Sequence, residues 1–205
     1  QRLVRTDFPL FDSFAAQPLG DDLQQFLAAG EPPIVFTFGS AITQAAEAFA
    51  VSAEACLRLG RRGLLLTMFN DQVPAGLPAS VKWLPYVPFR DLLPHAAALV
   101  HHGGIGSTAE ALRAGVPQLV VPMAYDQFDN AARVEALGIG TSIARRRYRA
   151  GKVARALSAL LKSETVKQRC RTVATRFADP DTTQSIAACI ERALMNPPEN
   201  HDDQT

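Results

Sequence analysis

Two glycine turns in the sequence carry the residues best suited to chemistry. The longer turn reads HHGGIGST from His101 to Thr108, and the shorter one is Gly39-Ser40. Glycine lets a ligand approach the backbone closely, and a helix that begins in such a turn offers free N–H groups and a favourable dipole to an anion. Hydroxyls at Ser107 and Thr108 add further donors. The two turns therefore predict a binding site for phosphate groups, most simply a diphosphate.

The longer turn also fits a rival interpretation. Gly104, Gly106 and Ala109 match the G-x-G-x-x-A fingerprint of dinucleotide-binding proteins, and Asp126 follows Gly106 by 20 residues. That fingerprint belongs to the first strand, turn and helix of a fold, and its acidic residue closes the next strand. Here several elements precede the turn. An NAD-binding oxidoreductase domain is therefore the less favoured alternative.

Short apolar runs must position both turns. They occupy residues 34–38, 63–68, 81–84, 97–100 and 119–121, with helical or turn-rich sequence between them. Each run is continuously apolar, which indicates strands whose two faces are both covered by helices. The pattern predicts an α/β fold with a doubly wound, Rossmann-like parallel sheet, whose ligands bind where the strands end.

The chain divides into three predicted parts. Residues 1–33 are rich in Pro and Gly around one helical stretch, 21–29, and are predicted to be an interdomain linker or arm. Residues 34–195 form the predicted nucleotide-binding domain, which ends in amphipathic helices near 153–161 and 186–194 with helical sequence at 171–177. Residues 196–205 are predicted to be a disordered tail. Without an initiator Met or a signal peptide, we expect a piece of a longer, cytoplasmic protein.

Composition limits the kind of partner. The 205 residues are 47% apolar, enough for one packed domain, and 21 basic residues against 20 acidic ones leave a net charge of +1. Such a balance supplies no electrostatic field for a nucleic-acid partner. Three widely spaced cysteines argue against a disulfide framework and a zinc site. Neither a metal nor a cofactor is expected. The ligand must follow from a local site.

Residues 86–130 carry a resemblance to a known family. They read YVPFRDLLPHAAALVHHGGIGSTAEALRAGVPQLVVPMAYDQFDN. In register, this segment contains aromatic-x-Pro, His-x-Gly-x-x-Ser-x-x-Glu, Gly-x-Pro and Asp-Gln. It resembles the donor-binding signature of the UDP-glycosyltransferase family, and most closely the bacterial members that act on lipids, sterols and natural products. The resemblance implies the C-terminal half of a GT-B fold, in which two Rossmann-like domains face each other across a cleft.

The resemblance also implies roles for individual residues in binding a nucleotide sugar. Tyr86 would stack on the pyrimidine, the Val87 backbone would pair with its edge, and Glu110 would hold the ribose hydroxyls. His102 would have the catalytic role, since an imidazole can stabilise charge on the leaving diphosphate. The diphosphate would be bound by Ser40, His102, Gly104, Ser107 and Thr108. The sugar would be bound by Asp126 and Gln127.

Other positions stay open. Tyr86 stands where many members have Trp and Phe89 where they often have Gln, which leaves UDP against dTDP undecided. The arginines from Arg145 to Arg149 suggest an anion site, but a solvated face or an interface to a missing domain is favoured for them. His101 is expected to be structural.

The implied activity is inverting transfer of a hexose from a UDP- or dTDP-sugar to a hydroxyl of a lipid, sterol or natural product. The family places the general base, a His, in the N-terminal domain, and no residue here matches it. We therefore expect this chain to bind a donor and to need its own N-terminal acceptor domain or a partner subunit for transfer. Any peripheral membrane contact would come through that domain. A non-catalytic nucleotide-sugar-binding subunit is the other alternative.

Overall fold

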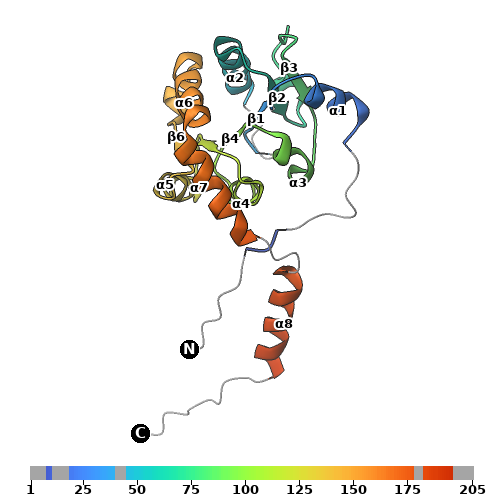
Figure 1. The fold of residues 1–205 in the computed structure, drawn as a ribbon, viewed down its shortest axis with the longest axis vertical. Coiled ribbons are helices and arrows are strands. Elements are labelled where there is room, and N and C mark those ends of the chain that lie inside the picture. The colour runs from blue at the N-terminus through green and yellow to red at the C-terminus, as the bar shows by residue number, and fades with distance from the viewer. Residues whose placement is uncertain (1–7, 11–18, 40–44, 178–181, 196–205) are drawn as a thin grey trace.

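Six parallel strands form one sheet in a computed structural model that describes residues 8–10, 19–39, 45–177 and 182–195 (Figure 1). The strand order is β3-β2-β1-β4-β5-β6. In chain order the strands are β1 Ile34–Thr37, β2 Gly63–Leu66, β3 Val81–Leu84, β4 Ala98–His101, β5 Gln118–Val120 and β6 Gly140–Ser142. The parallel, doubly wound sheet predicted from the sequence is confirmed.

Helices cover both faces of the sheet. The α-helices of the described residues are α1 Asp21–Ala28, α2 Ala46–Leu59, α3 Phe89–Leu92, α4 Ile105–Ala114, α5 Gln127–Ala136, α6 Ala150–Lys162, α7 Glu164–Ala174 and α8 Thr182–Met195, of which α8 lies apart from the sheet. Neighbouring residues of one strand serve opposite faces, because Phe36 packs with α2 and α6 whereas Val35 packs with α1 and α4. Both are fully buried, which explains why the strand sequence is apolar throughout.

The strand order reverses direction between β1 and β4. Strands β1, β2 and β3 extend to one side of this point, and β4, β5 and β6 extend to the other. Connections that leave toward opposite faces open a crevice at the carboxyl ends of the two adjacent strands, where open α/β sheets bind ligands. The topology thus selects the ends of β1 and β4 as the place to examine.

Two elements differ from the sequence prediction. The short strand β6 was not predicted, since its Gly-Thr-Ser sequence is neither apolar nor long enough to signal a strand. Helix α7 begins at Glu164, earlier than the predicted helical stretch 171–177, and Ser163 caps it by accepting a hydrogen bond from the Val166 N–H at 3.2 Å. Residues 175–177 continue as a 3₁₀ turn.

The regions outside the central sheet behave differently from one another. Helix α1 lies within the predicted arm, yet its Leu23 is buried in the same cluster as Val35, so it packs on the sheet. Helix α8 lies apart from the layers in Figure 1, with Leu194 and Met195 exposed. The domain boundary at residue 33 stays a prediction, and the predicted tail lies outside the described residues.

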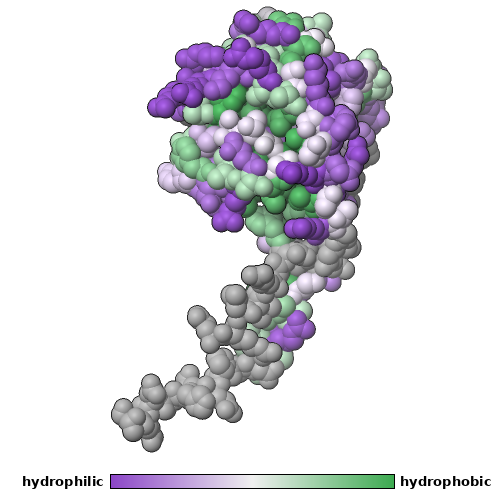
Figure 2. Space-filling model, turned by 60° about the vertical axis from the view of Figure 1, so that its left-hand side comes forward, coloured by the Kyte–Doolittle hydropathy of each residue, from purple (hydrophilic) through white to green (hydrophobic). Residues whose placement is uncertain are grey.

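The surface mixes residue types. Figure 2 shows hydrophilic residues interspersed with smaller hydrophobic patches over one face of the folded body, in line with the nearly balanced charge. No described helix is both long and apolar enough to cross a membrane.

Candidate functional site

The two predicted glycine turns meet at the strand-order reversal. Gly39 follows β1, and residues 102–104 follow β4, which is hydrogen-bonded to β1 along its length with Thr37 opposite His101. Ser40, predicted to bind diphosphate, lies outside the described residues. The remaining residues of both turns therefore occupy the crevice that the topology selects.

The His102 imidazole fills the space that two glycines leave open. A Cβ on Gly39 would lie 3.0 Å from its Cε1, and a Cβ on Gly104 would lie 2.5 Å from its Nε2. Gly39 also has φ +95°, a conformation that side-chain-bearing residues rarely adopt. The ring is thus held between the ends of β1 and β4 by backbone that cannot carry a side chain.

The surroundings of the His102 ring also affect its protonation. Its Nδ1 is buried and has no hydrogen-bond partner among the described residues. Burial lowers the pKa of His102, and the nearby Asp126 carboxylate opposes this by raising it. A neutral imidazole at pH 7 follows, and an incoming diphosphate would favour its protonation.

Helix α4 begins directly behind this ring. Gly104 is its N-cap and supplies no side-chain cap, so the N–H groups of the first turn have no partner within the helix. Ser107 is half-buried in that turn. The Thr108 hydroxyl donates to the Gly104 carbonyl at 3.0 Å and its side chain is buried, so a contact with diphosphate would have to use the remaining capacity of that oxygen.

Glu110 lies on the next turn of α4. Its carboxylate accepts a hydrogen bond from Arg113 at 2.7 Å, and its side chain is only 15% exposed. A solvated helix residue would be far more exposed. The ion pair fixes the direction of the carboxylate.

The loop between β5 and α5 is closed by Gln127. Its Oε1 accepts hydrogen bonds from the Met123 N–H at 2.8 Å and the Ala124 N–H at 3.0 Å. This oxygen is therefore engaged by the loop, and a contact with sugar would come from the side-chain NH₂ group. Tyr125, at the loop tip, has φ +53° and is 91% exposed. Asp126, which follows it, is exposed at the start of α5.

Asn130 joins this loop to the glycine turn. Its Nδ2 donates both to the Gly103 carbonyl and to Asp126 Oδ2, each at 2.9 Å, while its side chain is buried. Asn130 ends the signature segment but received no role from the sequence. The available signal was its spacing of four residues from Asp126 on a helix. The structure makes it the residue that sets Asp126 relative to the turn.

Tyr86 and Val87 follow β3 at the far side of β1. Tyr86 is 65% exposed, and Val87 is buried against the core. Strands β2 and β1 separate β3 from β4, so three strand spacings, about 14 Å in all, lie between these strands. This separation suits an extended ligand with a planar group at one end and phosphates at the other.

His101, beside His102, belongs to the core. It is fully buried, its Nε2 pairs with Gln118 Oε1 at 3.0 Å, and its Nδ1 accepts from the Gly103 N–H at 3.1 Å. Burial is the main cause that lowers the pKa of His101 to about 3 from 6.5. The structural interpretation of His101 fits this arrangement, which shapes the turn from below.

Folding stability is expected to fall as pH drops below 6.5. The unfolded chain then takes up a proton at His101 that the folded chain refuses until about pH 3, so stability is lost across that window. Between pH 7 and pH 5, protonation of His101 in the unfolded chain should lower the free energy of unfolding by about 2 kcal/mol. Urea unfolding at both values measures it. The dependence of the unfolding free energy on pH should become flatter in His101→Gln. It should persist in the control His95→Gln, whose imidazole is exposed. Equal pH dependence in the two variants would disprove the assignment to His101.

Fold and site together define a Rossmann-like domain in which two glycine turns and a helix N-terminus meet at the strand-order reversal, the place where open α/β sheets bind ligands. The G-x-G-x-x-A match begins α4 after β4, and Asp126 is the N-cap of α5 and does not close a strand, so neither feature has the dinucleotide-binding context. The chain belongs to the family described as Erythromycin biosynthesis protein CIII-like, C-terminal domain, which it matches over residues 64–192.

Relatives and solved structures agree with this assignment. The chain is 37% identical over 172 residues to an uncharacterized glycosyltransferase of Mycobacterium leprae, covering 82% of this chain and 40% of that protein. It is 43% identical over 118 residues to O-mycaminosyltylonolide 6-deoxyallosyltransferase of Streptomyces fradiae, covering 57% and 27%. The crystal structure of the glycotransferase of kitacinnamycin superposes with a TM-score of 0.73 at 29% identity, covering 81% and 44%.

These matches confirm the predicted GT-B C-terminal domain. The chain spans less than half the length of the curated relatives it matches.

Proposed function

We propose that this chain is the nucleotide-sugar-binding domain of an inverting glycosyltransferase that moves a hexose from UDP or dTDP to a hydroxyl of a lipid, sterol or natural product. The observation that carries the proposal is the position of the His102 side chain. Its ring is wedged between Gly39 and Gly104 at the crevice, next to the uncapped start of α4. A diphosphate placed there would meet an imidazole and free N–H groups together.

The donor would lie along the carboxyl edge of the sheet. Exposed Tyr86 offers a face for the pyrimidine, and Glu110, oriented by Arg113, offers a carboxylate for the ribose. Asp126 offers an acceptor for sugar hydroxyls beyond the diphosphate. The proposed reaction uses no resident cofactor, because His102 and the N-terminus of α4 would stabilise the leaving diphosphate.

Catalysis also requires residues on the acceptor side of the sugar. Attack on the anomeric carbon from the face opposite the diphosphate needs a base that deprotonates the acceptor hydroxyl. We assign that base and most of the acceptor pocket to an N-terminal domain, supplied in the same polypeptide or by a partner chain. A single displacement would then give inverted configuration.

The isolated chain is expected to bind UDP or dTDP more tightly than NAD. Calorimetric titration with each nucleotide tests this, and Glu110→Ala should weaken UDP binding by about 1 to 3 kcal/mol, the range for hydrogen bonds to a charged group. Glu54→Ala is the matched control, because Glu54 forms an exposed helical pair with Arg58 on α2. Tighter binding of NAD would refute the proposal, and unchanged affinity in folded Glu110→Ala would remove the ribose role.

Asn130→Ala is expected to weaken nucleotide-sugar binding more than binding of the bare nucleotide. The change frees Asp126 from its anchor and leaves the buried Gly103 carbonyl unpaired, which should also cost about 1 to 3 kcal/mol of stability. Titrations with UDP and UDP-glucose separate the two effects. Asp129→Ala, at an exposed neighbouring position, should change neither affinity. Equal losses for both ligands would show that Asn130 acts on the turn alone.

A further inference from the structure

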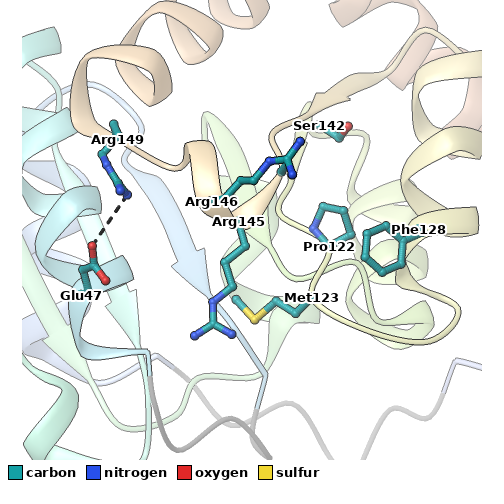
Figure 3. Close-up of a pocket in the computed structure, with 9 residues that line it drawn as sticks. Glu47, Pro122, Met123, Phe128, Ser142, Arg145, Arg146 and Arg149 are labelled. Atoms are coloured by element: carbon teal, nitrogen blue, oxygen red, sulfur yellow. Dashed lines mark ion pairs between the residues drawn. The ribbon is translucent and has the colours of Figure 1, made fainter.

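A pocket opens on the α2 and α6 face of the carboxyl edge, outside the proposed donor site. Its volume is about 730 Å³, and it lies between the ends of β5 and β6 and the start of α2 (Figure 3). Small-molecule sites commonly have volumes of this order. None of the described residues assigned above to the nucleotide sugar lines it. The proposed donor site therefore leaves this pocket unexplained.

The pocket has two chemically distinct walls. Pro122, Met123 and Phe128, from the β5–α5 region, form an apolar wall, and Phe128 is 57% exposed. Arg145, Arg146 and Arg149 form the other wall, and Figure 3 shows the Arg145 side chain extending past Met123 while Arg146 extends toward Ser142. A ligand that fills it should have an apolar body and an anionic group.

The arginine wall is firmly built. Tyr148, in the middle of the arginine segment, is buried, and its hydroxyl lies 2.9 Å from Ser52 Oγ on α2. Its ring also packs edge-on against Phe38, with centroids 5.8 Å apart. Burial raises the pKa of Tyr148, so the hydroxyl stays neutral. The segment is therefore anchored to the core, although the flanking arginines are exposed.

Positive charge in the pocket is only partly compensated. Glu47 is the one carboxylate among the described residues that line the pocket, and it pairs with Arg149 at 3.7 Å. Within the described parts of the chain, no carboxylate forms a salt bridge with Arg145 or Arg146. Guanidinium groups bind carboxylate and phosphate through two parallel hydrogen bonds, so these two arginines suit such a group.

We propose that this pocket binds the molecule that receives the sugar, and that this acceptor is an amphiphile bearing a carboxylate or phosphate. The pocket shares the β5–α5 loop with Asp126, so an acceptor held there would lie beside the donor's sugar. Its apolar body would rest on Met123 and Phe128, with its acid on Arg145 and Arg146. The inference rests on the proposed function and adds to it the chemical class of the acceptor.

The test titrates the full chain with octanoate, with the uncharged analogue octanamide, and with inorganic phosphate, following arginine side-chain N–H signals by NMR. Octanoate should bind about tenfold more tightly than octanamide, since a charge-assisted hydrogen bond distinguishes them, and added salt should weaken it. Inorganic phosphate should bind more weakly than octanoate. Phosphate binding as tight as that of octanoate would overturn the amphiphile in favour of a simple anion site.

Matched variants locate the site. Arg145→Gln and Arg146→Gln should each weaken octanoate binding about tenfold and leave UDP binding unchanged. Arg147→Gln is the control, because Arg147 belongs to the same exposed segment but does not line the pocket. Equal effects of all three variants would overturn the assignment.

Two further outcomes separate this inference from the proposed function. If UDP binds and octanoate does not, the acceptor inference fails while the donor site stands. If octanoate binds at the arginines and UDP does not, the proposed function fails and the acceptor role falls with it. Loss of octanoate binding when the N-terminal domain is added would show that the arginines form an interdomain contact, which also overturns the inference.

Discussion

His102→Ala, in an enzyme completed with its N-terminal domain, is expected to slow sugar transfer by about 10²- to 10³-fold, the usual cost of removing one group that stabilises developing charge. Donor affinity should fall much less. The reason is that negative charge on the diphosphate grows as the bond to the sugar breaks, so an interaction with His102 is stronger in the transition state than in the bound donor.

The geometry supports a contact that is fixed in advance. A Cβ at Gly39 or Gly104 would crowd the imidazole, so the two glycines hold the ring in place and it needs little reorganisation during the reaction. Burial lowers the pKa of His102, so it begins neutral and can take up a proton as charge develops beside it. A more exposed histidine would lose both advantages.

The measurement compares kcat with the donor dissociation constant for His102→Ala. His95→Ala is the control, because His95 is exposed in a 3₁₀ turn and should leave both values unchanged. A loss of donor affinity as large as the loss of rate would show that His102 contributes only to ground-state binding.

The same assay tests the division of labour between the domains. The isolated chain should show no detectable transfer, because it lacks both the proton acceptor and the alignment of two reactants. Addition of the N-terminal domain should restore transfer, with inverted configuration read by NMR of the product. Turnover by the isolated chain, or retained configuration, would contradict the proposed mechanism.

The sequence was sufficient for features that depend on local chemistry. Continuous apolar runs predicted five of the six strands. The glycine turns could be identified because a positive φ or a close approach of another group favours glycine at that one position. The family signature extended this to the domain type. None of these inferences required knowledge of which strands are neighbours.

Features that depend on distant pairing were out of reach. The bond from Asn130 to the Gly103 carbonyl spans 27 residues, and the contact between Tyr148 and Ser52 spans 96. The strand order decides both of them. For the same reason the sequence favoured a solvated face or an interface to a missing domain for the arginine segment, since only the fold places Arg145 and Met123 in the lining of one pocket.

Gly103→Ala is expected to destabilise the fold by about 2 to 5 kcal/mol, from a strained backbone and an overpacked site together. Gly103 has φ +93°, and a Cβ there would lie 2.8 Å from Val120 Cγ1 and 3.0 Å from the backbone oxygen of Gln127. Its own N–H and carbonyl are bonded to His101 and Asn130, so the backbone cannot shift without loss.

Gly106 is the matched control, and it should respond in the opposite direction. It lies in the first turn of α4, where a Cβ would meet nothing within 4 Å in the described structure. Alanine in a helix is better by about 0.5 to 1 kcal/mol, so Gly106→Ala should raise stability in urea unfolding. The fold therefore gives no reason for glycine at this position.

A ligand does give such a reason. If the diphosphate approaches the start of α4 closely, a methyl group at position 106 should weaken UDP binding although the protein is more stable. Urea unfolding and calorimetric titration of the same sample measure both quantities. A more stable Gly106→Ala protein that binds UDP as well as the unaltered chain would show that the diphosphate does not approach this turn, and the donor site would have to be placed elsewhere along the carboxyl edge.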